Sequence, residues 1–230
     1  MKNLHIGIIP DGNRRYSKSR GMKTYEGYYK GLDNINNILE NLSNYDQVGD
    51  KVKMITMYVA SINNLTKRES EETEELYNAM RYYLKSPKID IIHKNEINVK
   101  FVGHLHLLPQ DLQNDITKLQ QSTQNYQEYY FNLAIGYDGK QEILDTINKI
   151  VRDSKTSPVS YTDLSSYLYI SDEIDLVIRT GKEKRSSGFF PLQTTYAEWF
   201  YFDKMWPEFT FDDFKQCISD FEQRSRRFGL

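Results

Sequence analysis

The 230-residue sequence has few or none of several features on which other classes of protein depend. Its one cysteine, Cys217, excludes an internal disulfide and a cysteine-cluster metal site, and it fits a reducing compartment. No stretch approaches the roughly 18 apolar residues of a membrane-spanning helix, and the first residues lack the apolar segment of a signal peptide. We therefore expect a cytoplasmic protein that does not cross a membrane, with peripheral contact to a bilayer left open.

An excess of charge of one sign is also missing, because 30 Lys and Arg side chains face 32 Asp and Glu side chains and give a net charge of −2. Such a chain has no general basic field to hold nucleic acid, so any polyanion has to be bound locally. A glycine-rich dinucleotide loop and a Walker loop are absent as well, which argues against a flavodoxin-like or nucleotide-binding protein. The length fits one domain over residues 1–230.

Short apolar runs rich in β-branched residues alternate along the chain with segments of helical periodicity. Strands are predicted at residues 4–9, 52–60, 97–102, 129–135 and 174–178, and an aromatic stretch at 189–202 holds one more. Helices are predicted at residues 25–42, 69–84, 109–119, 140–151, 162–168 and 210–226. This alternation predicts an α/β fold in which helices flank both faces of a central, mainly parallel sheet of about six strands.

Three polar clusters each follow a predicted strand directly. They are residues 11–15 (Asp-Gly-Asn-Arg-Arg), 61–64 (Ser-Ile-Asn-Asn) and 179–181 (Arg-Thr-Gly). In a parallel sheet, ligands bind outside the carboxyl ends of the strands. We therefore expect the three clusters to share one crevice.

The residue types of the first cluster suit a phosphate and a divalent cation. Backbone N–H groups around Gly12, together with Arg14 and Arg15, can hold phosphate oxygens. Asp11 can hold the cation on that phosphate. The alternative interpretation is an ordinary turn with solvated charges.

A second group of cations follows the fifth strand. It consists of Arg179, Lys182, Lys184 and Arg185, all within seven residues. The arginine fork suits phosphate oxygens, although a solvated surface loop would have the same composition. Glu198 stands just before an apolar run, where a carboxylate normally needs a cation, and magnesium bound with a diphosphate would supply one.

The order and spacing of these motifs along the whole chain resemble those of the cis-prenyltransferases, the undecaprenyl diphosphate synthase family. The motifs that carry the resemblance are Asp11-Gly12-Asn13-Arg14-Arg15-Tyr16, Ser61-x-x-Asn64-Leu65-x-x-Arg68, Arg179-Thr180-Gly181-x-Glu183-x-Arg185-x-Ser187-Gly188-Phe189, Tyr196-Ala197-Glu198, Trp206-Pro207 and Arg226-Arg227-Phe228-Gly229. Several separate motifs in the right order are far more specific than any one of them.

The resemblance implies a Mg²⁺-dependent enzyme that joins an allylic prenyl diphosphate to isopentenyl diphosphate, releases pyrophosphate and forms a cis-prenyl diphosphate. The allylic substrate would be dimethylallyl, geranyl or farnesyl diphosphate, and the working form would be a homodimer. The implied catalytic residues are Asp11, Asn13, Ser61, Asn64 and Arg68, the implied substrate-binding residues are Gly12, Arg14, Arg15, Tyr28, Arg179, Arg185 and Ser187, and the implied metal ligands are Asp11 and Glu198.

The family also builds a hydrophobic tunnel or pocket for the prenyl chain, which here would lie between the sheet and the helices at 25–42 and 69–84. The candidate wall residues are Tyr77, Met80, Tyr83 and Leu84. The alternative for each of them is ordinary helix-core packing.

Two departures from the usual family pattern keep other functions open. Gly27-Tyr28 stands where Gly-His is typical, and Phe190-Pro191-Leu192-Gln193 stands where Leu-Leu-Trp-Gln is commoner. Both resemble the branch that couples two dimethylallyl diphosphates into lavandulyl-type skeletons, so irregular head-to-middle coupling is one alternative. A non-catalytic accessory subunit of a prenyltransferase complex is another, although Asp11, Asn13 and Arg15 are all present.

Overall fold

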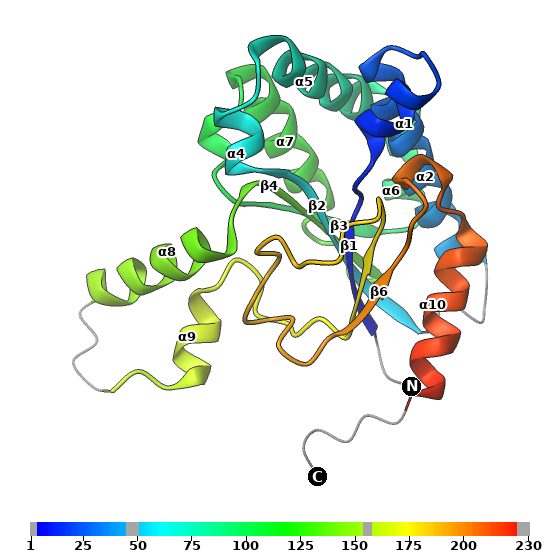
Figure 1. Cartoon of the computed structure of the whole chain (residues 1–230). Coiled ribbons are helices and arrows are strands. Elements are labelled where there is room, and N and C mark those ends of the chain that lie inside the picture. The colour runs from blue at the N-terminus through cyan, green and yellow to red at the C-terminus, as the bar shows by residue number, and fades with distance from the viewer. Residues whose placement is uncertain (1–3, 45–50, 154–157, 225–230) are drawn as a thin grey trace.

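The computed structural model describes residues 4–44, 51–153 and 158–224. Its centre is a six-stranded, all-parallel sheet in the order β3-β4-β2-β1-β5-β6 (Figure 1). The strands are β1 (Leu4–Ile9), β2 (Val52–Ser61), β3 (Ile97–Val102), β4 (Tyr129–Tyr137), β5 (Leu176–Arg179) and β6 (Glu198–Tyr201). The prediction of a parallel α/β sheet of six strands is confirmed.

Strand β1 lies inside the sheet, and all six of its residues are buried. A continuous apolar run suits a strand that is covered on both faces. β1 pairs with β2 on one side and β5 on the other, so that Ile8 is level with Met57 and Ile178. At Gly7 a Cβ atom would come within 2.6 Å of Cε1 of Phe189, so glycine lets the Phe189 ring lie directly against the sheet.

Four of the long helices place apolar side chains in the larger of two core clusters, which lies on one face of the sheet. These helices are α2 (Thr24–Asn44), α5 (Ser70–Lys85), α7 (Gln110–Thr123) and α10 (Phe211–Gln223). Because side chains alternate along a strand, Ile178 faces this cluster and Val177 faces the smaller one, which includes Phe189 and Phe190. Helices α8 (Gly139–Arg152) and α9 (Tyr161–Tyr167) pack on each other to one side of the molecule (Figure 1).

All predicted strands and helices are present, and most ends shift by only a few residues. β5 begins at Leu176, two residues later than predicted, and only Glu198–Tyr201 of the aromatic stretch is a strand. The unpredicted elements are α1 (Asn13–Ser19), α4 (Ile62–Thr66), α6 (Asp90–Lys94) and the 3₁₀ turns η1 (Pro87–Ile89), η2 (Leu105–Leu107) and η3 (Trp206–Glu208). They are too short for an apolar period to reveal them.

Two further predictions concern the C-terminal motif and membrane crossing. The motif at residues 226–229 lies outside the described residues. Within the described part of the chain, no helix combines the length and the apolar character that crossing a membrane requires.

Candidate active site

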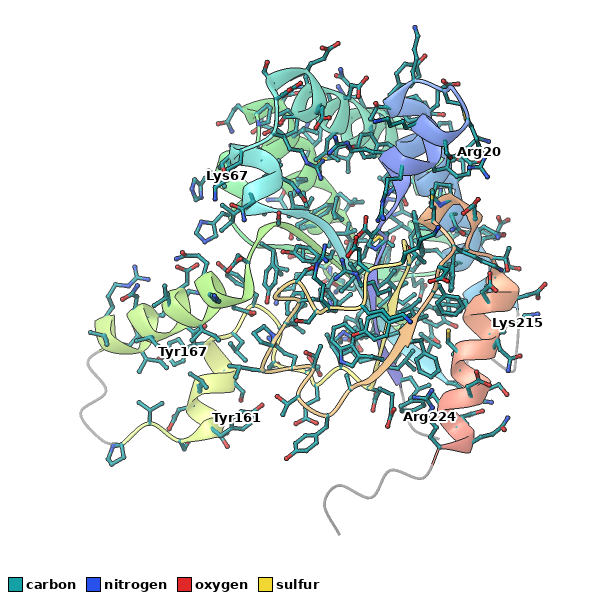
Figure 2. The ribbon with its side chains drawn as sticks, viewed as in Figure 1. Arg20, Lys67, Tyr161, Tyr167, Lys215 and Arg224 are labelled. Carbon is teal, nitrogen blue, oxygen red and sulfur yellow. The ribbon has the colours of Figure 1, made fainter. Side chains whose placement is uncertain are left out.

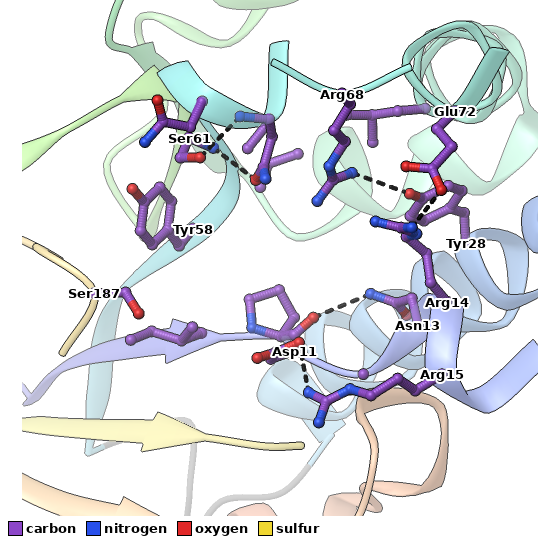
Figure 3. Close-up of a pocket in the computed structure, with 18 of the residues that line it drawn as sticks. Asp11, Asn13, Arg14, Arg15, Tyr28, Tyr58, Ser61, Arg68, Glu72 and Ser187 are labelled. Carbon is purple, nitrogen blue, oxygen red and sulfur yellow. Dashed lines mark hydrogen bonds and ion pairs between the residues drawn. The ribbon is translucent and has the colours of Figure 1, made fainter. Parts of the chain in front are cut away.

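A cavity of about 890 Å³ opens at the carboxyl ends of β1, β2 and β5. The predicted site residues that line it are Asp11, Gly12, Asn13, Arg14, Arg15, Tyr28, Ser61, Asn64, Arg68, Arg179, Arg185 and Ser187. Figure 3 shows Asp11 and Arg15 on one side of this cavity, with Ser61 and Arg68 across from them. The prediction that the three polar clusters share one crevice is confirmed.

The turn from β1 into α1 carries Asp11 to the cavity. Gly12 has a φ of 110°, and a Cβ atom there would lie 2.8 Å from Cβ of Met205. Glycine therefore permits both the left-handed turn and the close approach of the chain. Gly12 itself has no side chain to cap α1, and the first N–H groups of a helix have no acceptor within it.

The Asp11 carboxylate lies between two guanidinium groups. Its Oδ1 is 2.9 Å from Nη2 of Arg15, and its Oδ2 accepts a hydrogen bond from Nη2 of Arg179 at 3.3 Å. Arg179 is only 3 % exposed, and its Nη1 donates to Oγ of Ser187 at 2.8 Å and to the carbonyl oxygen of Arg185. Arg179 thus joins the end of β1 to the loop that follows β5.

The cavity is positively charged, although the whole chain is slightly acidic. Six cationic side chains and three carboxylates line it, which leaves an excess of three positive charges. Arg14 pairs with Glu72, and Glu183 lies between Arg15 and Arg185, with an ion pair to each. The site therefore attracts an anion that can replace these internal carboxylates.

Tyr28 and Arg68 lie side by side in the cavity wall (Figure 3). Nη1 of Arg68 donates to the Tyr28 hydroxyl at 3.2 Å. Burial raises the pKa of Tyr28, and the nearby Arg68 opposes that rise, so the phenol is neutral at physiological pH. Because the Tyr28 hydroxyl carries no charge, this hydrogen bond does not neutralise the positive charge of Arg68.

Ser61 and Asn64 have a structural role that the sequence interpretation missed. The Ser61 hydroxyl accepts from the Asn64 backbone N–H at 3.0 Å, and the Asn64 side-chain oxygen accepts from the Ser61 N–H at 3.1 Å. Together they cap the start of α4. The cap does not use the Ser61 hydroxyl proton or the Asn64 amide protons, which are donors suited to an anion in the cavity.

A second, apolar cavity of about 130 Å³ lies beside the first, between the sheet and helices α2 and α5. Asn13 and Tyr28 line both cavities. Of the predicted wall residues, Met80, Tyr83 and Leu84 line this apolar cavity, whereas Tyr77 packs in the core instead. The Asn13 side-chain oxygen is buried at this junction without a hydrogen-bond partner among the described residues.

A cationic cavity beside an apolar one fits the cis-prenyltransferase family that the motifs indicated. Comparison with known proteins shows whether the chain belongs to that family. The family model described as "Putative undecaprenyl diphosphate synthase" matches residues 9–229. The chain belongs to this family. It is therefore a prenyltransferase by descent, and the resemblance inferred from the sequence is confirmed.

Curated relatives of this prenyltransferase include two proteins of the genus Thermoplasma. The protein of Thermoplasma acidophilum is 38 % identical over 98 % of this chain and 88 % of its own length, and that of Thermoplasma volcanium is 36 % identical over the same shares. Both are named tritrans,polycis-undecaprenyl-diphosphate synthase (geranylgeranyl-diphosphate specific).

Two solved structures share the fold over nearly the whole prenyltransferase chain. Lavandulyl diphosphate synthase from Lavandula x intermedia, in complex with dimethylallyl diphosphate, has a TM-score of 0.88 and 27 % identity over 98 % of both chains. A probable undecaprenyl diphosphate synthase from Campylobacter jejuni has a TM-score of 0.81 and 23 % identity over the whole of both chains.

Glu198 is the one predicted site residue that this prenyltransferase does not bring to the cavity. Glu198 begins β6 and is level with Leu176 of β5, which in turn is level with Ile6 of β1. Ile6 precedes Asp11 by five residues, so Glu198 lies roughly 16 Å from the Asp11 end of the sheet, at about 3.3 Å per residue. Its Oε2 accepts from Arg224 at 2.7 Å, and Figure 2 shows Arg224 at the lower end of α10. Within one chain, the cation that compensates Glu198 is therefore Arg224 rather than a metal at Asp11.

The cavity also has wall residues that the sequence analysis did not name, among them Glu72, Tyr58 and Asp138. Asp138 directly follows β4 and caps α8 through hydrogen bonds from two backbone N–H groups. The rule that singled out the other clusters, a polar residue directly after a parallel strand, would have found it. Nothing comparable marks Glu72, which reaches the cavity from the first turn of α5.

Proposed function

We propose that this family member transfers an allylic prenyl group from its diphosphate to isopentenyl diphosphate and releases pyrophosphate in a Mg²⁺-dependent reaction. One observation carries the proposal: the cationic cavity and the apolar cavity meet at Asn13 and Tyr28. A prenyl diphosphate has an anionic head on an apolar tail and fits across that junction. The predicted roles of the individual site residues are part of this proposal.

The arginines of the cavity supply the binding and the electrostatic stabilisation. Arg15 would hold the allylic diphosphate, and Arg179, Arg185 and Ser187 would hold the acceptor diphosphate. Cations placed where negative charge develops on the leaving pyrophosphate lower the barrier to breaking the C–O bond. This chemistry needs no covalent nucleophile.

The donor set at Asp11 fits magnesium. Mg²⁺ usually binds one or two protein carboxylates together with substrate phosphates and water, and Asp11 is a carboxylate in a cavity suited to phosphates. Asp11 would hold the ion against the diphosphate. When bound there, Mg²⁺ would neutralise charge on the leaving group.

A second candidate function is the irregular coupling of two dimethylallyl diphosphates. It is favoured by the likeness to lavandulyl diphosphate synthase and by the small size of the apolar cavity, about 130 Å³. Against it, the two Thermoplasma relatives are named for geranylgeranyl diphosphate and undecaprenyl products, and they have the higher sequence identity to this chain, 36 % and 38 % against 27 %.

One assay separates these functions. The protein is incubated with Mg²⁺ and dimethylallyl, geranyl, farnesyl or geranylgeranyl diphosphate, each with and without isopentenyl diphosphate, and products are measured by mass spectrometry. We expect elongated products only when isopentenyl diphosphate is present, and none after chelation of the metal. Product from dimethylallyl diphosphate alone would favour irregular coupling, and no product from any pair would favour an accessory subunit.

We further propose that the enzyme acts as a homodimer. Helix α8 exposes Leu144, Ile147 and Val151 by 53 %, 46 % and 69 %, at a spacing that puts them on one side of the helix. A second copy would cover this apolar face. Light scattering of the wild type is expected to give twice the 27.2 kDa of one chain. The variant Ile147→Glu is expected to have a lower mass than the wild type. A wild type that is monomeric would contradict the proposal.

A cytoplasmic location and peripheral membrane contact stay predictions.

A further inference from the structure

We propose that Glu142, a buried carboxylate outside the cavity, is a positioning residue that acts through the Tyr137 hydroxyl to fix the loop carrying Arg185 and Ser187. The inference rests on the proposed function for the identity of the ligand, because that loop is assigned to the acceptor diphosphate. The anchoring of the loop itself can be tested without turnover.

Glu142 lies in the first turn of α8 and is 1 % exposed. Its Oε2 accepts from the Tyr137 hydroxyl at 2.6 Å, and its Oε1 accepts from the Tyr169 backbone N–H at 2.9 Å and from Nε2 of Gln193 at 3.2 Å. Burial raises the pKa of this carboxyl, and the three donors oppose that rise. A buried carboxylate is costly, and the three hydrogen bonds that compensate it all fix elements around one loop.

Glu142 determines how the Tyr137 hydroxyl is used. A phenol has one proton, and the carboxylate can only accept, so that proton goes to Glu142. The lone pairs of the phenol oxygen are then free, and one of them accepts the Phe190 backbone N–H at 3.1 Å. The Phe190 ring stacks on the Tyr137 ring with centroids 4.2 Å apart. Tyr137 therefore holds both the backbone and the ring of Phe190.

The loop that Tyr137 holds has a strained backbone. Phe190 has a φ of 40° and Ser187 a φ of 51°, in the left-handed region that side-chain-bearing residues avoid. Such conformations persist only where the surroundings enforce them. At Ser187 the enforcing group is Arg179, which donates to its hydroxyl, and at Phe190 it is Tyr137.

Tyr58 connects Tyr137 and Phe189 to the cavity wall. It lines the cavity, donates from its hydroxyl to the Tyr137 carbonyl oxygen at 3.0 Å, and has its ring 5.7 Å from that of Phe189. The loop is therefore held at its cavity end by Arg179 and at its core end by Tyr137 with Glu142. Loosening the core end would displace Ser187 and Arg185 and leave the Asp11 side of the cavity in place.

The test compares Tyr137→Phe, Glu142→Gln and the double variant. Tyr137→Phe keeps the ring that stacks on Phe190 and removes only the hydroxyl, so it is the variant more certain to fold. We expect each single variant to raise the acceptor KM about tenfold, as expected for losing one hydrogen bond that holds a ligand loop. The allylic KM should change less than twofold. The double variant should be little worse than Tyr137→Phe alone, because Glu142 acts on Phe190 through the Tyr137 hydroxyl that this variant has already removed.

Hydrogen exchange gives the readout that does not depend on activity. The amides of residues 186–190 should exchange faster in both single variants, while those of β1 keep the wild-type rate. Thr56→Val is the matched control, since it removes a buried hydroxyl bonded to His5 and Asn132 that lines neither cavity. It should lower thermal stability without changing the loop exchange or either KM.

Two results would overturn the proposal: unchanged exchange of residues 186–190 in Tyr137→Phe, or equal rises in both KM values. A wild type that turns over no diphosphate pair would instead reject the proposed function, and the exchange data would still decide whether Glu142 and Tyr137 anchor the loop.

Discussion

Replacing Asp11 by asparagine is expected to lower kcat about 10³-fold, the loss typical of removing one group that stabilises charge in a transition state. The amide keeps the size and one oxygen of the side chain but removes the negative charge that would hold Mg²⁺. It also leaves Arg15 and Arg179 without the carboxylate that lies between them. The fold should survive, because Arg179 keeps its bonds to Ser187 and Arg185, and a partly exposed ion pair contributes only about 1 kcal/mol.

Two measurements distinguish a metal ligand from a residue that only orients arginines. Wild-type protein should bind pyrophosphate more tightly with Mg²⁺ than without it, and Asp11→Asn should bind it equally in both conditions. Asp33→Asn is the matched control, because Asp33 is also an ion-paired carboxylate but pairs with Lys88 on the exposed side of α2. Its kcat should stay within twofold of wild type. Activity of Asp11→Asn within a few-fold of wild type would remove Asp11 from the mechanism.

The fold was predictable from the sequence because short, mainly apolar runs alternate with segments of helical periodicity. In β1 all six residues are buried, which agrees with the interpretation of this run as a strand covered on both faces. The cavity was predictable for a related reason. Chains that leave parallel strands meet at one edge of the sheet, and the polar residues at 11–15, 61–64 and 179–181 stand at those exits.

The roles of Ser61 and Glu198 could not be predicted, because each depends on a partner that only the folded chain selects. Ser61 and Asn64 look like a pair of polar site residues in the sequence, but the turn into α4 makes them cap each other's backbone. Glu198 is recognisable as a carboxylate in apolar surroundings. Its partner, Arg224, is 26 residues away at the end of another element, and the register of β6 sets which edge of the sheet it occupies.

Replacing Arg179 by lysine is expected to raise the acceptor KM about 30-fold and to destabilise the protein by about 3 kcal/mol, the cost of breaking a buried network of charged hydrogen bonds. Arg179 is 3 % exposed, and its two terminal nitrogens bond Asp11, Ser187 and the Arg185 carbonyl oxygen. Lysine keeps the charge but has one nitrogen, so it cannot span the same partners. The melting temperature and the two KM values are the measurements.

Arg185→Lys is the control for Arg179→Lys, because it changes an exposed arginine of the loop after β5 instead of a buried one. The Arg185 side chain is 64 % exposed and pairs with Glu183, so this change should raise the acceptor KM and leave the melting temperature within about 2 °C, as expected for an exposed pair worth under 1 kcal/mol. If Arg179→Lys lowers stability and leaves the acceptor KM unchanged, Arg179 is only a brace between β1 and the loop. A rise in the acceptor KM that exceeds that of Arg185→Lys gives Arg179 a role in acceptor binding, through its guanidinium or through the loop that this guanidinium holds at Ser187 and Arg185.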